Sequence, residues 1–156
     1  MGKDFERQAI IKKGSQLINS VSNSMVPHIT IIVGASYGAG TYAMSGQAYN
    51  NRFTFLWPTA KIAVMGPEQI ARVMSIVRKA KAKRTGEKFD EKADAQIRKM
   101  VEAAAEGMSH GLVASSMVTD DGIIDPRDTR TILGFCLSVV SNIPIEGANE
   151  YGVFRL

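Results

Sequence analysis

Residues 27–69 of the chain read PHITIIVGASYGAGTYAMSGQAYNNRFTFLWPTAKIAVMGPEQ, and the expected fold follows from this stretch. Residues 29–33 form a short, largely β-branched run bounded by Pro27 and Gly34, which is typical of a buried strand. Residues 52–57 and 61–65 are expected to form two more short strands. Strands that alternate with helical segments predict an α/β fold.

A run of small residues, GASYGAG at positions 34–40, follows the first strand. Such residues let the backbone turn sharply and approach a neighbouring group closely. We expect a helix to begin at Thr41, so that the N–H groups of Ala39 and Gly40 lie near its N-terminus without intrahelical partners. Two such amides can stabilise an oxyanion. A plain strand-to-helix connection with no ligand explains the same pattern, and both interpretations stay open.

Apolar periodicity and capping residues predict the helices of the remaining chain. The first is expected over residues 4–23, with Asp4 as its N-cap and Gly14 marking close helix packing. Another begins at Pro67 and is expected to turn an apolar stripe toward the core. The stripe consists of Ile70, Val73, Met74 and Val77. Further helices are expected over residues 90–106 and 109–117, and a last one begins at Asp125 after a brief strand at 123–124.

The composition is that of an ordinary globular domain, and we expect residues 1–156 to form a single one. The chain has 45% apolar and 22% charged residues and a formal net charge of +4. Cys136 is its single cysteine, which excludes an internal disulfide and predicts a buried structural thiol. No apolar run is long enough to span a membrane and no signal peptide is recognised, so a cytoplasmic protein is expected, or a mitochondrial matrix protein in a eukaryote.

Basic residues are concentrated in residues 78–88, RKAKAKRTGEK. Such a run can bind phosphates, nucleic acid or an acidic neighbouring chain. It contains no interleaved aromatic residues for base stacking, so a solvated helix end and loop is the favoured interpretation, and no nucleic-acid partner is expected.

Few side chains are suited to direct catalysis. His28 and His110 are the two histidines, and neither has a cysteine or carboxylate at metal-ligand spacing, so no metal site is expected and a Ser-His-Asp triad is disfavoured. A phosphate-binding loop is disfavoured as well, because the glycine-rich turn carries Ala and Tyr where such loops carry Lys.

Four segments together resemble a known family. They are SYGAGTYAMSGQAYNNRFTFLWPTAKIAVMGPEQ at 36–69, DDGIIDPRDTR at 120–130, GKDFERQAIIKKGSQLINSVSNSMVPHIT at 2–30 and EYGVFRL at 150–156. The chain resembles the C-terminal domain of the carboxyltransferase (beta) subunit of biotin-dependent acyl-CoA carboxylases, nearest to the methylcrotonoyl-CoA and geranyl-CoA carboxylase branch. Members of that family are several times longer, and the resemblance includes no N-terminal domain.

The resemblance implies a crotonase-like ββα spiral with a helical excursion. It implies transfer of a carboxyl group from carboxybiotin, on a carrier domain, to an unsaturated branched acyl-CoA. By position, the backbone N–H groups of Ala39 and Gly40 would stabilise the oxyanion of biotin. The residues implied to shape the biotin pocket are Tyr37, Gly38, Tyr42, Met65 and Gly66, although ordinary core packing also explains both tyrosines.

The implied partners are an N-terminal carboxyltransferase domain or chain, a biotin carboxylase or biotin carrier subunit, and further copies in a homo-oligomer. Without the N-terminal domain we expect little or no activity from this polypeptide alone. A non-catalytic assembly module that keeps the fold is the alternative. A relative of the enoyl-CoA hydratases is less well supported, because no glutamate stands beside the turn.

Overall fold

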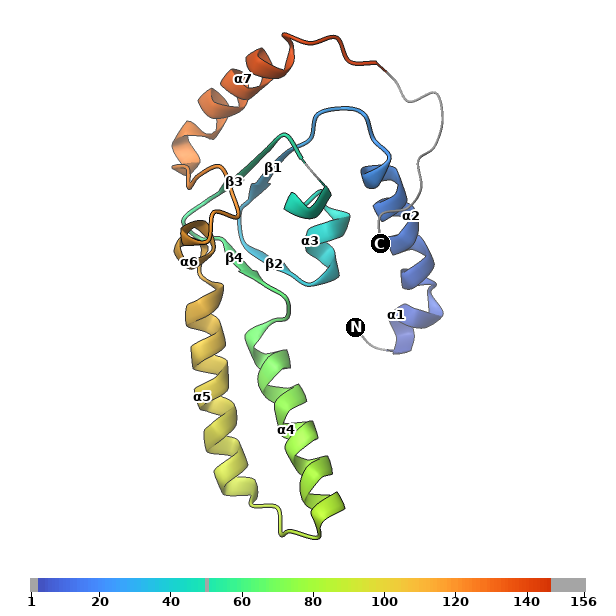
Figure 1. Ribbon diagram of the computed structural model, residues 1–156, viewed down its shortest axis with the longest axis vertical. Coiled ribbons are helices and arrows are strands. Elements are labelled where there is room, and N and C mark those ends of the chain that lie inside the picture. Colours follow the sequence, from blue (N-terminus) through green and yellow to red (C-terminus); the bar gives the residue numbers. More distant parts are fainter. Residues whose placement is uncertain (1–2, 50, 147–156) are drawn as a thin grey trace.

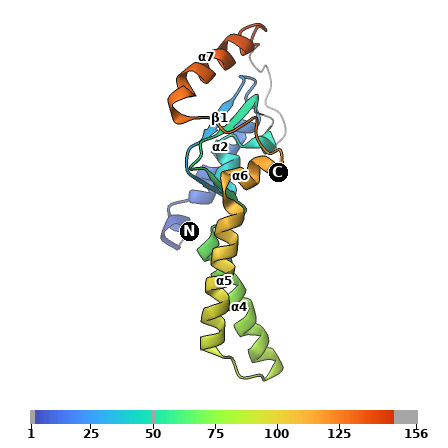
Figure 2. The same ribbon diagram turned by 90° about the vertical axis from the view of Figure 1, so that its left-hand side faces the viewer.

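The computed structural model describes residues 3–49 and 51–146. These residues form a mixed α/β structure with the following elements in chain order: α1 Lys3–Arg7, α2 Ile10–Ser22, β1 Ile29–Ile32, β2 Ala35–Tyr37, α3 Ala39–Ala43, η1 Gln47–Tyr49, β3 Phe53–Leu56, β4 Lys61–Ala63, α4 Pro67–Thr85, α5 Glu91–Ser109, α6 Gly111–Ser116, η2 Pro126–Asp128 and α7 Thr129–Val140. Strands and short helices make up the body, from which α4 and α5 project together (Figure 1; Figure 2).

The strands pair in parallel as two two-stranded sheets, β1 with β3 and β2 with β4. In the first sheet Ile29 pairs with Phe53 and Ile32 with Leu56. The predicted strands within 29–33, 52–57 and 61–65 are therefore confirmed, each somewhat shorter than expected. The short strand β2 lies inside the glycine-rich stretch that was expected to be a turn. Parallel pairing requires long crossovers, and these bring the end of β2 beside the end of β4.

The buried core is small and lies where the sheets meet α6. Leu56 and Ala60 are fully buried and Ala114 nearly so, and Ile32, Ile62 and Ile123 pack against them. The expected strand at 123–124 appears as a parallel bridge between Ile123 and Leu56. On both sides of it the chain hydrogen-bonds to Leu56, whose N–H donates to Gly122 and whose carbonyl accepts from Ile124.

Helices α4 and α5 form an antiparallel hairpin and include the helices expected from Pro67 and over residues 90–106. Pro67 occupies the first turn of α4, and Gly86 ends the helix with a φ of 73°. Asp90 caps α5 by accepting two backbone hydrogen bonds. Between the helices, the guanidinium of Arg78 contacts the buried carboxylate of Asp94 at 2.7 Å. Most of the basic run 78–88 is exposed around the end of α4, as the favoured interpretation predicted.

Three expectations about helix packing are wrong. The first helix is two, because Ala9 adopts a left-handed conformation with φ 59° between α1 and α2, and Asp4 lies inside α1 instead of capping it. Gly14 marks no close packing, since no atom lies within 4 Å of the position that a Cβ would take. The α4 stripe does not face the core, because Val73 and Val77 are 46% and 62% exposed.

Helix α7 follows the predicted start. Asp125 accepts a hydrogen bond from the Arg127 backbone at the entrance of η2, and α7 continues from there. Cys136 on α7 is 1% exposed, which confirms a buried thiol, and burial raises the pKa of that thiol. The indole N–H of Trp57 donates to Thr129 Oγ1 at 3.1 Å and ties the start of α7 to the end of β3.

Candidate functional site

The glycine-rich turn lies at the carboxyl end of β2, directly against the chain that leaves β4. Tyr37 pairs with Ala63, and the N–H of Gly38 donates to the Ala63 carbonyl at 3.1 Å. Gly38 has φ 62° and ψ −140°, a conformation that is largely restricted to glycine. A Cβ at this position would lie 3.1 Å from the carbonyl oxygen of Val64. The turn therefore needs glycine for its conformation and for its close approach to β4.

The second predicted turn, at Met65 and Gly66, lies beside the first. Gly66 is buried, and a Cβ there would lie 3.5 Å from Cδ2 of Tyr37. The Gln69 side chain covers the Cβ position of Gly66 most closely and the edge of the Tyr37 ring lies next to it, and Met65 is 39% exposed. The parallel pairing of β2 with β4 brings four of the predicted site residues together, although they lie almost thirty positions apart in sequence: Tyr37, Gly38, Met65 and Gly66.

The two predicted oxyanion donors are at the surface. Helix α3 begins at Ala39, two residues earlier than expected, so Ala39 and Gly40 are its first two residues. Both residues are exposed, and neither amide has a hydrogen-bond partner among the residues that the structure describes. Because α3 has only five residues, its dipole adds little, and the two free N–H groups are the relevant feature.

Tyr42 lies apart from this group. Its ring packs edge-on against Tyr49, with 6.0 Å between the ring centroids. It also lines a hollow of about 330 Å³ together with Gln47, Met108 and Met117. Tyr42 is thus near the turn in sequence, but its side chain contacts other residues than those of the turn.

Two hydroxyl residues that the sequence analysis did not single out bracket the turn. Ser36 Oγ on β2 and Thr41 Oγ1 on α3 are 2.8 Å apart, within hydrogen-bonding distance. Within the turn, the N–H of Thr41 donates to the Gly38 carbonyl at 3.1 Å. Serine and threonine beside a glycine-rich turn commonly form such local bonds, and that preference was the available signal.

The other end of α3 is held by β1. Thr30 Oγ1 donates to the Ser45 carbonyl, and His28 Nδ1 contacts Ser45 Oγ, both at 2.7 Å. Ser45 is largely buried and has φ 57°. No carboxylate is hydrogen-bonded to His28 among the contacts of the described residues, so this serine–histidine pair lacks the third member of a triad. Its effect is to anchor α3.

A charged pair lies behind the turn on β4. The Lys61 ammonium forms an ion pair with Glu106 on α5, which raises the pKa of Lys61, and Tyr37 adds a smaller effect in the same direction. The pair links β4 to α5 at Lys61, which is the residue that pairs with Ala35 of β2.

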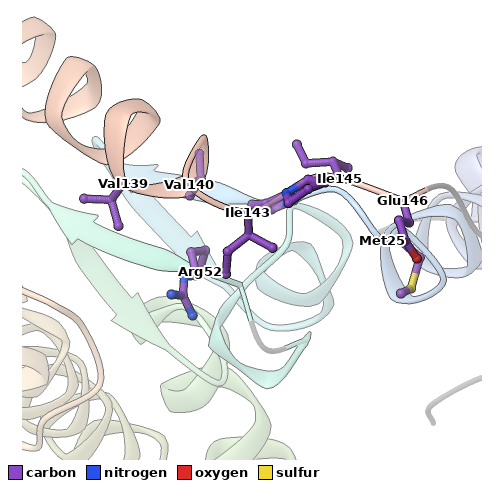
Figure 3. A pocket seen from close by; sticks show the side chains of 9 residues that line it. Met25, Arg52, Val139, Val140, Ile143, Ile145 and Glu146 are labelled. Atoms are coloured by element: carbon purple, nitrogen blue, oxygen red, sulfur yellow. The ribbon is translucent and has the colours of Figure 1, made fainter.

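Another hollow lies elsewhere, between the loop before β1 and the end of α7 (Figure 3). It has a volume of about 490 Å³ and is lined by Met25, Pro27, Arg52, Val139, Val140, Ile143, Pro144, Ile145 and Glu146. None of the predicted site residues lines it.

Within residues 3–49 and 51–146, no three His, Cys, Asp or Glu side chains are grouped so as to hold a metal ion. Over the same part of the chain, no helix combines the length and the apolar character needed to cross a bilayer.

Comparisons with known proteins bear on nearly the whole chain. Residues 1–150 match the family model of the carboxyl transferase domain. The chain is 56% identical, over its full length, to a probable biotin-dependent acyl-coenzyme A carboxylase beta2 subunit of Mycobacterium tuberculosis, of which it covers 30%. It is 42% identical, again over its full length, to the mitochondrial methylcrotonoyl-CoA carboxylase beta chain of Arabidopsis thaliana, of which it covers 26%.

The structural comparison agrees. The geranyl-CoA carboxylase beta subunit of P. aeruginosa matches with a TM-score of 0.81 and 39% identity over 98% of this chain and 29% of that subunit. The chain thus spans less than a third of the length of these relatives. The predicted family is confirmed: this chain belongs to the carboxyl transferase domain family, and its relatives are the beta subunits of biotin-dependent acyl-CoA carboxylases.

Proposed function

We propose that this chain is the biotin-facing part of an acyl-CoA carboxyltransferase, which transfers a carboxyl group from carboxybiotin to an unsaturated branched acyl-CoA. The observation that carries the proposal is the pair of exposed, unpartnered amides of Ala39 and Gly40 on a turn that glycine holds against β4. Family membership supports the reaction class. The names of the methylcrotonoyl-CoA and geranyl-CoA carboxylase relatives support the branched acyl group.

The proposed ligand presents a carbonyl oxygen to these residues. Carboxybiotin supplies an activated carboxyl group, whose departure leaves negative charge on the ureido oxygen. In our proposal Ala39 and Gly40 donate their backbone N–H groups to that oxygen, because fixed dipoles stabilise developing charge without reorganising. Gly38 and Gly66 let the two turns pack closely, because a Cβ would meet the Val64 carbonyl at Gly38 and the Gln69 side chain at Gly66. Tyr37 and Met65 are assigned an apolar wall beside them. Tyr42 is assigned the outer edge of the pocket, with less support because of its packing against Tyr49.

The remaining parts of the machinery are proposed to come from other chains or domains. An N-terminal carboxyltransferase domain would bind the acyl-CoA thioester, and a biotin carboxylase or carrier subunit would deliver biotin. We also propose that the fold is the crotonase-like spiral, with α4 and α5 as its helical excursion. Many large apolar side chains are exposed outside the small core, and this supports assembly with other subunits, including further copies of the chain.

The same exposed apolar surface favours a second candidate, a non-catalytic module that contributes assembly contacts only. Val64, Met100 and Val118 are 90%, 72% and 80% exposed. Surfaces of this kind serve assembly in either case, so the two candidates differ only in whether the turn acts in the reaction.

The test is carboxyltransfer in reverse, from a carboxylated acyl-CoA to free biotin. It compares the chain alone with a mixture that also contains a separately expressed N-terminal carboxyltransferase domain. The informative variant is Ala39→Pro, which removes one N–H group. Proline suits the first position of a helix. A residue before proline is normally extended, with φ about −60° and ψ about +140°, and Gly38 has the same angles with opposite signs. Because glycine has no Cβ, this conformation leaves the same room for the proline ring. Ala39→Ser keeps the N–H group and serves as the matched control.

We expect activity only in the mixture, and a decrease in kcat of about 100- to 1,000-fold for Ala39→Pro but not for Ala39→Ser. A folded Ala39→Pro variant with normal kcat would exclude the Ala39 amide as an oxyanion donor. An inactive wild-type mixture of folded components would exclude the catalytic proposal and leave the assembly module.

A further inference from the structure

The turn that carries the two amides is closed by the bond between Ser36 and Thr41. The hydroxyl oxygens are 2.8 Å apart and belong to the residues immediately before and after Tyr37–Gly40. Ser36 is fixed within the β2–β4 pairing, where it is opposite Ile62. The bond therefore ties the first turn of α3 to a strand of the sheet.

Two backbone hydrogen bonds also hold this end of α3, from the Gly38 N–H to the Ala63 carbonyl and from the Thr41 N–H to the Gly38 carbonyl, but neither involves the amides of Ala39 and Gly40. A helix of five residues gains almost no stability from its own hydrogen bonds, because the conformational entropy lost in forming the first turn offsets the few bonds that it makes. Thr41 lines two hollows, of about 320 and 330 Å³, so side-chain packing around it is incomplete. No atom lies within 4 Å of a Cβ position at Gly40. Packing therefore leaves the direction of the amides of Ala39 and Gly40 weakly determined.

The far end of the helix is already fixed. Ser45 is bonded to Thr30 on β1 and to His28 just before that strand, at 2.7 Å each. With that end anchored and Gly38 bonded to Ala63 on β4, the remaining freedom is movement of residues 39–41 relative to β2. The hydroxyl bond between Ser36 and Thr41 restrains this movement.

We propose that Ser36 and Thr41 are positioning residues, whose hydrogen bond aims the amides of Ala39 and Gly40 at the oxyanion; this inference rests on the proposed function. Neither side chain needs to touch the ligand. Their effect on the reaction is indirect, because a misplacement of catalytic donors by about 1 Å can lower the rate by about a hundredfold.

The test uses Thr41→Val, which removes the hydroxyl with little change in shape, and Thr41→Ser, which keeps the hydroxyl. Thr85→Val is the matched control, since Thr85 on α4 bonds only to carbonyls of its own helix. Backbone ¹⁵N order parameters of residues 38–41 report the rigidity of the turn. Steady-state kinetics of reverse carboxyltransfer in the mixture, with kcat and the KM for acyl-CoA measured separately, report the reaction.

For Thr41→Val we expect the order parameters of residues 38–41 to fall from about 0.85 to below about 0.6. We expect kcat to fall by about 10- to 100-fold at unchanged KM for acyl-CoA. Thr41→Ser should keep the order parameters and kcat close to those of the wild type, and Thr85→Val should change neither. With an active wild-type mixture, normal kcat in Thr41→Val overturns the positioning role alone, whatever the order parameters. A rigid turn combined with reduced kcat overturns it too, because the hydroxyl would then act by another route. Inactivity of the wild-type mixture removes the proposed function, and the positioning role with it.

Discussion

Gly38 and Gly40 are two residues apart, yet the structure predicts opposite effects when each is replaced by alanine. At Gly38, φ 62° and ψ −140° place an alanine in a strained region, which costs about 1–3 kcal/mol. Its Cβ would also lie 3.1 Å from the Val64 carbonyl oxygen, which must move by a few tenths of an ångström. Together these effects should lower the free energy of unfolding by about 2–3 kcal/mol. At Gly40 a Cβ meets open space inside a helix, so alanine should raise stability by about 0.5 kcal/mol.

Equilibrium unfolding in urea, followed by far-ultraviolet circular dichroism, measures both effects. With a slope of about 2 kcal/mol per molar urea, Gly38→Ala should shift the midpoint down by about 1–1.5 M. Gly40→Ala should leave it unchanged or slightly raised. If Gly38→Ala unfolds within about 0.2 M of the wild type, the inferred strain at the turn is absent. Equal destabilisation by both variants would mean that the turn tolerates no added atom, contrary to the open space at Gly40.

Three further predictions concern the core and the two ion pairs. Leu56→Ala removes a fully buried side chain from a small core and should lower the free energy of unfolding by about 2–3 kcal/mol, measured in urea. The Ser75 hydroxyl, with help from nearby guanidinium groups, lowers the pKa of Asp94. The ionised Asp94 carboxylate therefore contributes fully to stability above pH 3.8, and this contribution is lost as pH falls through the lowered pKa of the folded state. Asp94→Asn should reduce the loss of stability between neutral and acid pH, as measured by urea unfolding at several pH values. Glu106 raises the pKa of Lys61 in the folded state. The ion pair therefore contributes fully to stability below pH 10.5, and this contribution is lost as pH rises through the raised pKa. In an NMR titration Glu106→Gln should therefore return that pKa toward 10.5, and an unchanged value would rule out the ion pair in solution.

Local signals predicted the elements whose ends carry capping residues or proline. Pro67, Asp90 and Asp125 each lie where a helix or its first turn begins. The break at Ala9 had no such signal, because alanine favours helix and seldom adopts a left-handed conformation. Strand β2 was missed for a different reason. Its residues are small or polar, and they form a strand because β4 lies alongside.

The site was predicted unevenly for the same reason. Small residues in sequence mark a turn, so Gly38, Ala39 and Gly40 could be identified as its backbone. The contacts that hold the turn and α3 are partly local, as between Ser36 and Thr41, and partly tertiary. His28 and Ser45 are 17 positions apart, and only the fold brings the imidazole to the hydroxyl. Small residues in the sequence thus indicate the turn more readily than the tertiary contact between His28 and Ser45.

The apolar stripe of α4 shows what helical periodicity leaves undetermined. The face of α4 that contacts α5 carries Ser75 and Arg78, which bond to Asp94, while Ile76 and Val77 are about 60% exposed. Period 3.6 correctly finds that α4 is amphipathic, but it does not identify the neighbour that covers the apolar face. A hairpin joined by buried polar contacts, with apolar side chains outside, is reversed relative to an isolated globular unit. That reversal is the structural reason to treat subunit assembly as part of the proposed function, because contiguous exposed apolar surface marks sites of protein–protein contact.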